Sequence, residues 1–267
     1  MTNQLGAHAL VWSGTWDKSG ARHAISSAAK TGFDLIEVPI LDPFGIDTAM
    51  TRQLLDDYGL KAALSMGLPP HADVASEDKA VHAEGLRLLA RAVEVAGEVG
   101  AEALCGVLYS RLAKYPAPLS ERSRAHVVEA LQHLAARGEE AGIPVNLEVV
   151  NRYETNVVNT AADMLRLLDD TGARNLGVHL DTYHMNIEED DLCEALRASA
   201  GVLGCVHLSD SNRHQPGMGH VPFDAIFATL AAIDFDGVLS VECRLRGEPG
   251  EAVASAGRLL RGLLDGW

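Results

Sequence analysis

Residues 144–150, PVNLEVV, and residues 175–181, NLGVHLD, decide the fold of this 267-residue chain. Each is a short β-branched and apolar run with a carboxylate at or near its end, and each follows a helical stretch and a glycine, Gly142 or Gly172. A glycine between a helix and the next strand is where a left-handed C-cap is expected. The two segments therefore predict consecutive β-strands with a helix between them.

The same strand–helix unit recurs along the whole chain. Strands are predicted at Leu5–Val11, Phe33–Pro39, Leu60–Met66, Ala103–Tyr109, Pro144–Val149, Asn175–Asp181, Val202–Leu208 and Gly237–Cys243. Apolar residues at three-to-four spacing predict helices such as Asp78–Val99, Glu121–Ala141, Thr160–Asp169, Glu189–Ser199 and Phe223–Ala232. Left-handed C-caps are expected at Gly32, Gly59, Gly100, Gly142, Gly172 and Gly237.

Eight such units without a linker predict one α/β domain over residues 1–267, a (β/α)8 TIM barrel. Length alone would also allow two domains, but no Gly/Ser-rich, Pro-rich or low-complexity segment marks a boundary. No GxGxxG motif follows the first predicted strand, which weakens a dinucleotide-binding open sheet.

Composition narrows the location and the partners. With 22 Lys and Arg against 37 Asp and Glu, the net charge is −15, which argues against a nucleic-acid partner. No segment approaches the roughly 20 continuous apolar residues of a membrane span. The N-terminal residues MTNQLGAHALVW do not resemble a secretion signal, so a cytoplasmic location is expected. Four scattered cysteines, without a CxxC pair, are expected to be reduced thiols: Cys105, Cys193, Cys205 and Cys243.

Candidate functional residues lie near the ends of the last four predicted strands, where TIM barrels build their active sites. Period-two alternation points the neighbouring valines and leucines toward the helices and four polar residues into the barrel: Glu148, Asp181, His207 and Glu242. Alone, each acidic residue is more readily a helix cap or a solvated loop residue. Three carboxylates and an imidazole at one mouth, however, need a cation. This oxygen-rich set without a thiolate predicts one divalent ion per chain, Mn²⁺ first and Co²⁺ or Mg²⁺ as alternatives.

Four long segments resemble, in order and spacing, the D-tagatose/D-psicose (D-allulose) 3-epimerase family. They are LEVVNRYETNVVNT (147–160), HLDTYHMNIEEDD (179–191), VHLSDSNRHQPGMGHVPFD (206–224) and VECR (241–244). The resemblance covers close to the whole chain and implies the same four metal ligands. It also implies that Glu154, His184 and Arg213 hold the substrate.

The resemblance implies reversible C3 epimerisation of a free ketose such as D-fructose/D-psicose, D-tagatose or L-ribulose. One of Glu148 and Glu242 would remove the C3 proton, and the other would return a proton to the opposite face, through a metal-stabilised enediolate. A homodimer or homotetramer is expected, with a ketose as the small-molecule partner and neither nucleic acid nor a membrane.

The preferred ketose stays open because the sequence departs from the family at the far end of the pocket. His8 stands where several members have tyrosine, and Leu112 where some have tryptophan. His8 is therefore a candidate substrate contact, and Glu37, at the end of the second predicted strand, is another candidate partner for a substrate hydroxyl.

Three other functions are compatible with the predicted barrel. An aldose–ketose isomerase such as hydroxypyruvate isomerase would share the enediolate but return the proton to a different carbon. An abasic-site endonuclease would need a basic DNA-facing surface, which the charge of −15 argues against. A non-catalytic sugar-binding barrel would not need two proton-transfer groups, so the presence of both Glu148 and Glu242 argues against it.

Overall fold

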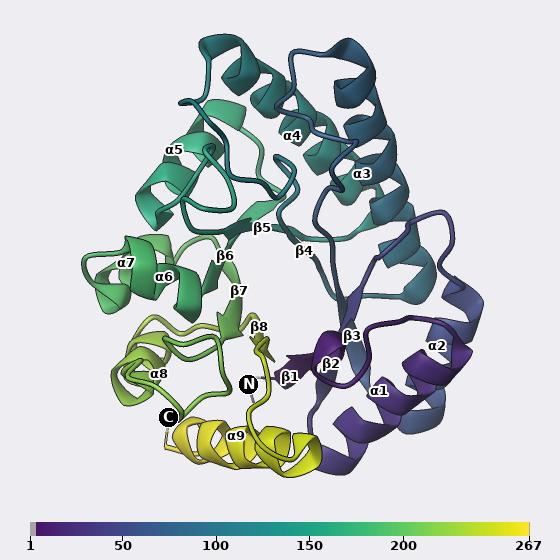
Figure 1. Ribbon diagram of the computed structural model, residues 1–267, viewed down its shortest axis with the longest axis vertical. Helices are drawn as coiled ribbons and strands as arrows, with labels where there is room; N and C mark the ends of the chain where they lie inside the picture. Colours follow the sequence, from purple (N-terminus) through teal and green to yellow (C-terminus); the bar gives the residue numbers. More distant parts are fainter. Residues whose placement is uncertain (1–3, 267) are drawn as a thin grey trace.

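Eight parallel strands form a closed barrel in sequence order, with helices around it (Figure 1). The structure is a computed structural model that describes residues 4–266. The strands are β1 (Leu5–His8), β2 (Leu35–Pro39), β3 (Lys61–Ser65), β4 (Leu104–Gly106), β5 (Val145–Val149), β6 (Leu176–Asp181), β7 (Leu203–Leu208) and β8 (Val238–Val241). Pairing of β1 with β8 closes the ring and confirms the predicted TIM barrel.

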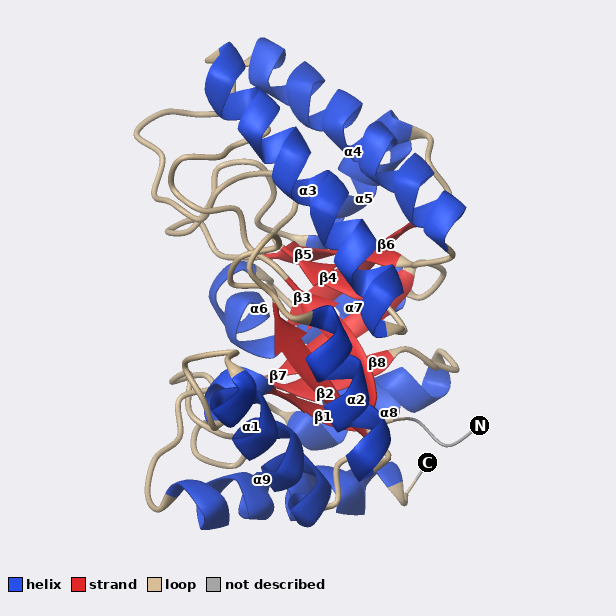
Figure 2. Cartoon of the chain, turned by 90° about the vertical axis from the view of Figure 1, so that its right-hand side faces the viewer, coloured by secondary structure: helices blue, strands red, loops and turns tan. Residues whose placement is uncertain are grey.

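The outer layer consists of helices, most of them in the connections between consecutive strands (Figure 2). A 3-10 turn, η1 (Ala9–Val11), follows β1 directly. The α-helices are α1 (Lys18–Thr31), α2 (Thr48–Tyr58), α3 (Lys79–Val99), α4 (Glu121–Ala141), α5 (Ala161–Thr171), α6 (Thr182–Glu188), α7 (Leu192–Ser199), α8 (Phe223–Ala232) and α9 (Pro249–Leu264). The last helix, α9, packs beside α1, so the helical layer also closes on itself.

Most predicted helices are confirmed to within two residues, but the predicted helix 189–199 begins too early. The chain leaves α6 at Glu189, and Asp191 accepts the backbone N–H groups of Cys193 and Glu194 as the N-cap of α7. An N-cap aspartate favours the start of a helix at the next residue, because its side chain accepts N–H groups that have no partner within the helix.

Five of the six glycines expected to end helices do so in the left-handed conformation, with φ between 62° and 84°. Gly237 is the exception: α8 ends at Ile233, and Asp234 takes the positive φ instead, at 52°. Gly237 is required for a different reason. A Cβ there would lie 2.4 Å from the carbonyl oxygen of Gly204 on the neighbouring strand, so only glycine fits.

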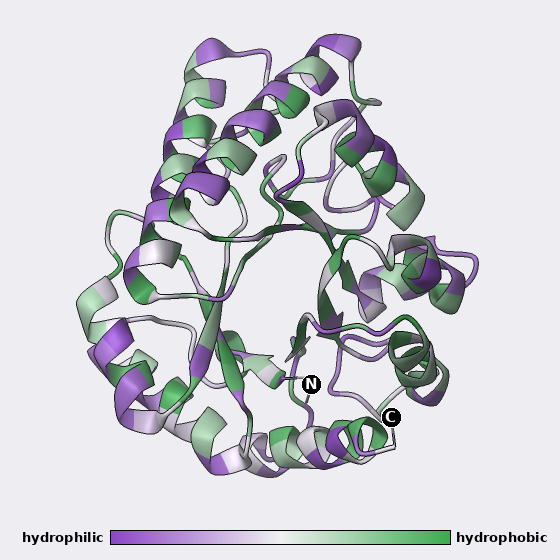
Figure 3. Cartoon of the chain, turned by 180° about the vertical axis from the view of Figure 1, so that it is seen from behind, coloured by the Kyte–Doolittle hydropathy of each residue, from purple (hydrophilic) through white to green (hydrophobic). Residues whose placement is uncertain are grey.

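Two apolar clusters explain which side chains reach the barrel mouth. The larger one lies between strands and helices and contains the outward residues of β5–β8, such as Leu147, Leu180 and Val206. The strands are mostly apolar and the helices polar on their outer sides (Figure 3). A smaller cluster fills the barrel interior: Leu35, Ala63, Ala103, Cys105, Cys205 and Val238. Inward positions further along the strands are polar and lie toward the mouth.

Long loops follow β3, β4, β5 and β7 and gather on one side of the barrel, at the left of Figure 2. These loops surround the carboxyl ends of the strands, where the site lies. Within residues 4–266, none of the helices has the length and apolar content needed to cross a membrane.

Candidate metal centre and active site

The four residues predicted to bind metal meet at the barrel mouth. Glu148 lies in β5, Asp181 ends β6, His207 lies in β7 and Glu242 follows β8 directly. Their possible ligand atoms all lie within 4.8 Å of one another. His207 Nδ1 is central, at 3.3 Å from Glu242 Oε2, 3.6 Å from Glu148 Oε1 and 3.8 Å from Asp181 Oδ2. The structure therefore contains a possible metal-binding cluster where the sequence predicted one.

Glu37 orients His207 within this cluster. The Nε2 atom of His207 lies 2.7 Å from Glu37 Oε2, and both side chains are buried. Nδ1 faces the three carboxylates and is buried without a hydrogen-bond partner. Such an unpaired nitrogen among carboxylates fits a divalent ion, with Glu37 as the carboxylate that fixes the imidazole. This role differs from the substrate contact that the sequence suggested for Glu37.

The charges in the cluster shift one another's pKa values. Burial alone would lower the pKa of His207, but the carboxylates of Glu37 and Glu242 hold it well above its usual range. Burial alone would raise the pKa of Glu242, but His207 and Arg213 hold it well below. Burial raises the pKa of Glu148 above its ordinary value. Without a metal, the cluster therefore relies on His207 and Arg213 for positive charge.

Arg213, predicted to contact substrate, bridges two carboxylates of the possible metal-binding cluster. Its guanidinium donates to Asp181 and Glu242, and it lies over the ring of Tyr183 at 4.9 Å. The backbone of Arg213 has a φ of 61°, which is uncommon for a residue with a Cβ. The loop that contains it must therefore be held firmly.

Asp210 holds this loop, and the sequence analysis missed it. Its buried carboxylate accepts backbone N–H groups from Ser211, Gly217 and Val221. An aspartate at the start of a loop rich in Ser, Asn and Gly is typical of a side chain that bonds to its own loop's backbone. That pattern could have identified it.

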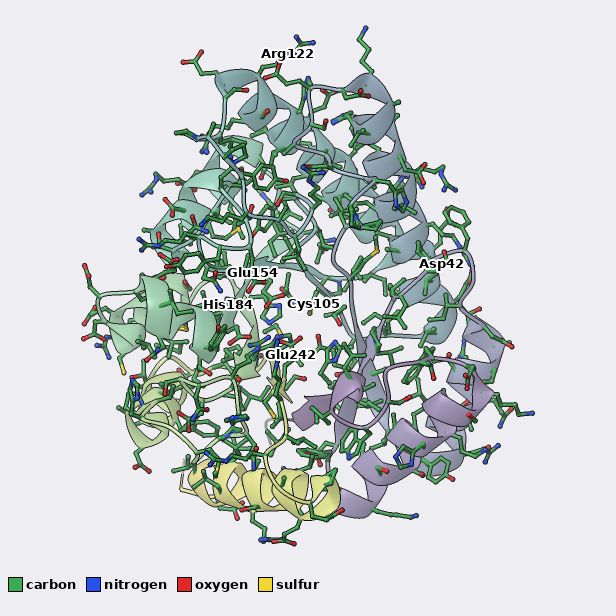
Figure 4. All side chains as sticks on the ribbon, viewed as in Figure 1. Asp42, Cys105, Arg122, Glu154, His184 and Glu242 are labelled. Carbon is green, nitrogen blue, oxygen red and sulfur yellow. The ribbon has the colours of Figure 1, made fainter. Side chains whose placement is uncertain are left out.

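Asn151 connects the other two predicted substrate residues. Its Nδ2 atom lies 2.8 Å from His184 Nδ1 and 3.1 Å from Glu154 Oε1, and its backbone N–H also donates to His184 Nδ1. Because Nδ1 accepts, the proton of His184 is on Nε2, which lies 4.0 Å from Glu148 Oε1. His184, Glu154 and Glu242 gather near the barrel centre, whereas Asp42 and Arg122 lie toward the rim (Figure 4).

A cavity of about 300 Å³ extends from the cluster across the mouth, at the lower end of the range for small-molecule sites. Its lining includes Glu148, His207 and Glu242 at one end and His8, Ser65 and Leu112 at the other. Both ring nitrogens of His8 are already engaged. Nδ1 accepts the Leu10 N–H at 3.2 Å, and Nε2 lies 2.9 Å from Ser65 Oγ.

Comparison with known proteins agrees with this geometry. The family model of the xylose isomerase-like TIM barrel matches residues 25–263. Fold and site together thus define a TIM-barrel enzyme of the isomerase class.

Relatives define the branch of that class. The chain is 47% identical over 239 residues to the L-ribulose 3-epimerase of Methylomonas sp. (strain DH-1), covering 90% of this chain and 84% of the relative. It is 44% identical to the ketose 3-epimerase of Arthrobacter globiformis, with coverages of 90% and 83%. The crystal structure of a D-allulose 3-epimerase from Methylomonas sp. in complex with D-allulose matches with a TM-score of 0.95 and 41% identity, over 98% of this chain and 97% of that one. The chain belongs to the ketose 3-epimerase family, as the motifs indicated.

Proposed function

We propose that this protein catalyses the reversible C3 epimerisation of free ketoses, with Glu148 and Glu242 as the two proton-transfer groups. The observation that carries the proposal is that both glutamates line one cavity, from β5 and from the end of β8, with His207 between them. One carboxylate can then take the C3 proton while the other returns a proton to the opposite face, which inverts that carbon.

The donor set supports one divalent ion per chain, held by Glu148, Asp181, His207 and Glu242. Mn²⁺ is the first candidate, with Co²⁺ and Mg²⁺ as alternatives, because three carboxylate oxygens and one imidazole suit a hard or borderline ion. When bound, the ion would supply Lewis acidity that stabilises negative charge on the sugar oxygens as the proton leaves.

Substrate positioning falls to residues on the loops around the mouth. His184 presents its Nε2–H toward Glu148, and Glu154 offers a carboxylate fixed by Asn151. Arg213 can donate to sugar oxygens once an ion takes over the charge of Asp181 and Glu242. His8 contributes at the far end of the cavity, where it orients the hydroxyl of Ser65. A homodimer or homotetramer and a cytoplasmic location stay predictions.

The test is hydrogen exchange at C3. The Mn²⁺-loaded protein is incubated in D2O, separately with D-fructose, D-psicose, D-tagatose, L-ribulose and hydroxypyruvate, and products are followed by NMR and chromatography. We expect a C3 epimer with deuterium at C3, and a loss of at least about 100-fold in rate for Glu148→Gln and Glu242→Gln. Glu129→Gln, at an exposed position of α4, is the matched control.

Measuring bound Mn²⁺ in each variant separates loss of a proton-transfer group from loss of the ion. An aldose product, or deuterium at C1, would move the function to aldose–ketose isomerisation. If the protein bound ketoses but exchanged no C3 hydrogen with solvent, it would instead be a non-catalytic sugar-binding barrel.

A further inference from the structure

His179 lies beneath the mouth of the barrel and has no visible role there. It points inward from β6, two residues before Asp181, and is fully buried. Neither Nδ1 nor Nε2 has a hydrogen-bond partner among the described residues. A neutral imidazole has one donor and one acceptor, and burying both unpaired is rare enough in proteins to need an explanation, such as a bound ion.

Two buried thiols lie beside this imidazole. Cys105 comes from β4 and Cys205 from β7, and neither forms a disulfide. The sulfur atoms and one nitrogen of His179 all lie within 4.8 Å of one another. Zn–S bonds of about 2.3 Å and Zn–N bonds of about 2.0–2.1 Å place the ligands of one tetrahedral ion roughly 3.5–4 Å apart. Small side-chain shifts would therefore bring all three onto one ion.

We propose that Cys105, His179 and Cys205 form a second metal site, which takes a thiophilic dication of the Zn²⁺ kind. Two thiolates balance the charge of such an ion, so the loaded site is neutral and can be buried in the barrel. Each ion bound displaces two thiol protons to solvent. The oxygen-rich cluster at the mouth prefers hard ions instead, so the two sites select different metals.

The second site lies next to the cluster at the mouth. The rings of His179 and His207 meet edge to face with centroids 4.0 Å apart. Glu148, His179 and His207 also have possible ligand atoms within 4.8 Å of one another, which links the two sites. The Nδ2 atom of Asn146 lies 3.7 Å from the sulfur of Cys105 and can stabilise a thiolate there.

Co²⁺ tests the proposal because it binds both oxygen-rich and sulfur-containing sites, and only sulfur ligation adds thiolate-to-cobalt absorption in the near ultraviolet. We expect the metal-stripped wild-type protein to bind two Co²⁺ per chain and to develop this absorption, which added Zn²⁺ then removes. The measurement needs no substrate, so its outcome is independent of the proposed epimerisation.

Cysteine variants test whether the thiolate-to-cobalt absorption comes from the site of Cys105, His179 and Cys205. Cys105→Ser and Cys205→Ser should each lose it and bind one Co²⁺ instead of two. Cys193→Ser, on α7, should keep both ions and the absorption, and circular dichroism checks the folding of all three. If a serine variant fails to fold, the sulfur count from X-ray absorption of the Zn²⁺-loaded wild-type protein decides. One Co²⁺ per chain without sulfur absorption would overturn the proposal, as would absorption that both serine variants retain.

Discussion

At the scale of single residues, Glu37 determines which nitrogen His207 presents to a metal. Its carboxylate lies 2.7 Å from Nε2, so Nδ1 faces the carboxylates of Glu148, Asp181 and Glu242. Replacing Glu37 with Gln keeps an acceptor but removes the charge, so we expect Mn²⁺ affinity to fall by about 10–100-fold. Calorimetric titration with Mn²⁺ measures this, with Glu129→Gln as the control. Unchanged affinity would show that His207 needs no orienting carboxylate.

Ser65 offers a second test, at the far end of the cavity. Because His8 donates from Nε2, the Ser65 oxygen accepts and its own proton is free for a sugar hydroxyl. If the proposed function holds, Ser65→Ala removes one hydrogen bond to the substrate, which contributes about 1.4 kcal/mol. We therefore expect KM to rise about 10-fold. The rate constant kcat should change less than about twofold, since the contact is remote from C3. A ketose without its terminal hydroxyl should show no difference between the two proteins, and a loss confined to kcat would contradict this role.

The convergence of the four candidate metal ligands could be predicted because a strand alternates its faces with period two. Inward-facing residues near the ends of β5–β8 had to converge once the barrel closed. Their partners could not be predicted in the same way. Glu37 meets His207 across 170 positions of sequence, and Asn151 reaches His184 across 33. Alternation predicts the direction of a side chain but not its neighbour on another strand or loop.

At the scale of elements, the loop from 209 to 222 depends on Asp210. Asp210→Ala removes the acceptor of three backbone N–H groups, and we expect a loss of about 2–3 kcal/mol, since water can reach part of the opened loop. For a chain of this size, the melting temperature should fall by about 4–6 °C. Activity should fall further, because Arg213 would lose its left-handed backbone position.

The stabilisation that Asp210 provides should depend on pH. Burial alone would raise the pKa of Asp210, but the backbone N–H groups hold it below its ordinary 3.8. A lowered folded-state pKa stabilises the protein above the unfolded value, and this stabilisation is lost as pH falls through the folded one. The stability difference between wild type and Asp210→Ala should therefore narrow below about pH 4. Thermal unfolding at several pH values measures it, and a constant difference would contradict the role of the carboxylate.

The elements also show where sequence patterns were insufficient. Long amphipathic helices such as α3 and α4 were predicted because they repeat their apolar stripe over 21 residues each. The segment that forms α6 has only 7 residues and begins directly after Asp181, which is its N-cap. So short a helix shows no complete apolar stripe. Its N-cap, Asp181, is also the last residue of β6, so the sequence pattern did not indicate a helix start there.

At the scale of the whole molecule, a metal at the mouth would cross-link four of the eight strands. Its four candidate ligands come from β5, β6, β7 and the end of β8. A bound ion stabilises the folded state by about 2.7 kcal/mol when its free concentration is 100 times its dissociation constant. Removing it with a chelator should therefore lower the melting temperature of the wild-type protein by roughly 5 °C.

Arg213 determines how large this effect is. Its guanidinium donates to Asp181 and Glu242 and so neutralises them without a metal, a role that a bound ion would take over. Arg213→Ala should therefore destabilise the metal-free protein more than the Mn²⁺-loaded one, and Mn²⁺ should raise its melting temperature by more than it raises that of the wild type. Alanine has the same Cβ at the left-handed position, so backbone strain is matched between the two proteins. Melting curves of both proteins, with chelator and with Mn²⁺, give the four values needed. Equal gains would mean that arginine and metal act independently, whereas a larger gain in the variant would mean that one positive charge replaces the other at the same carboxylates.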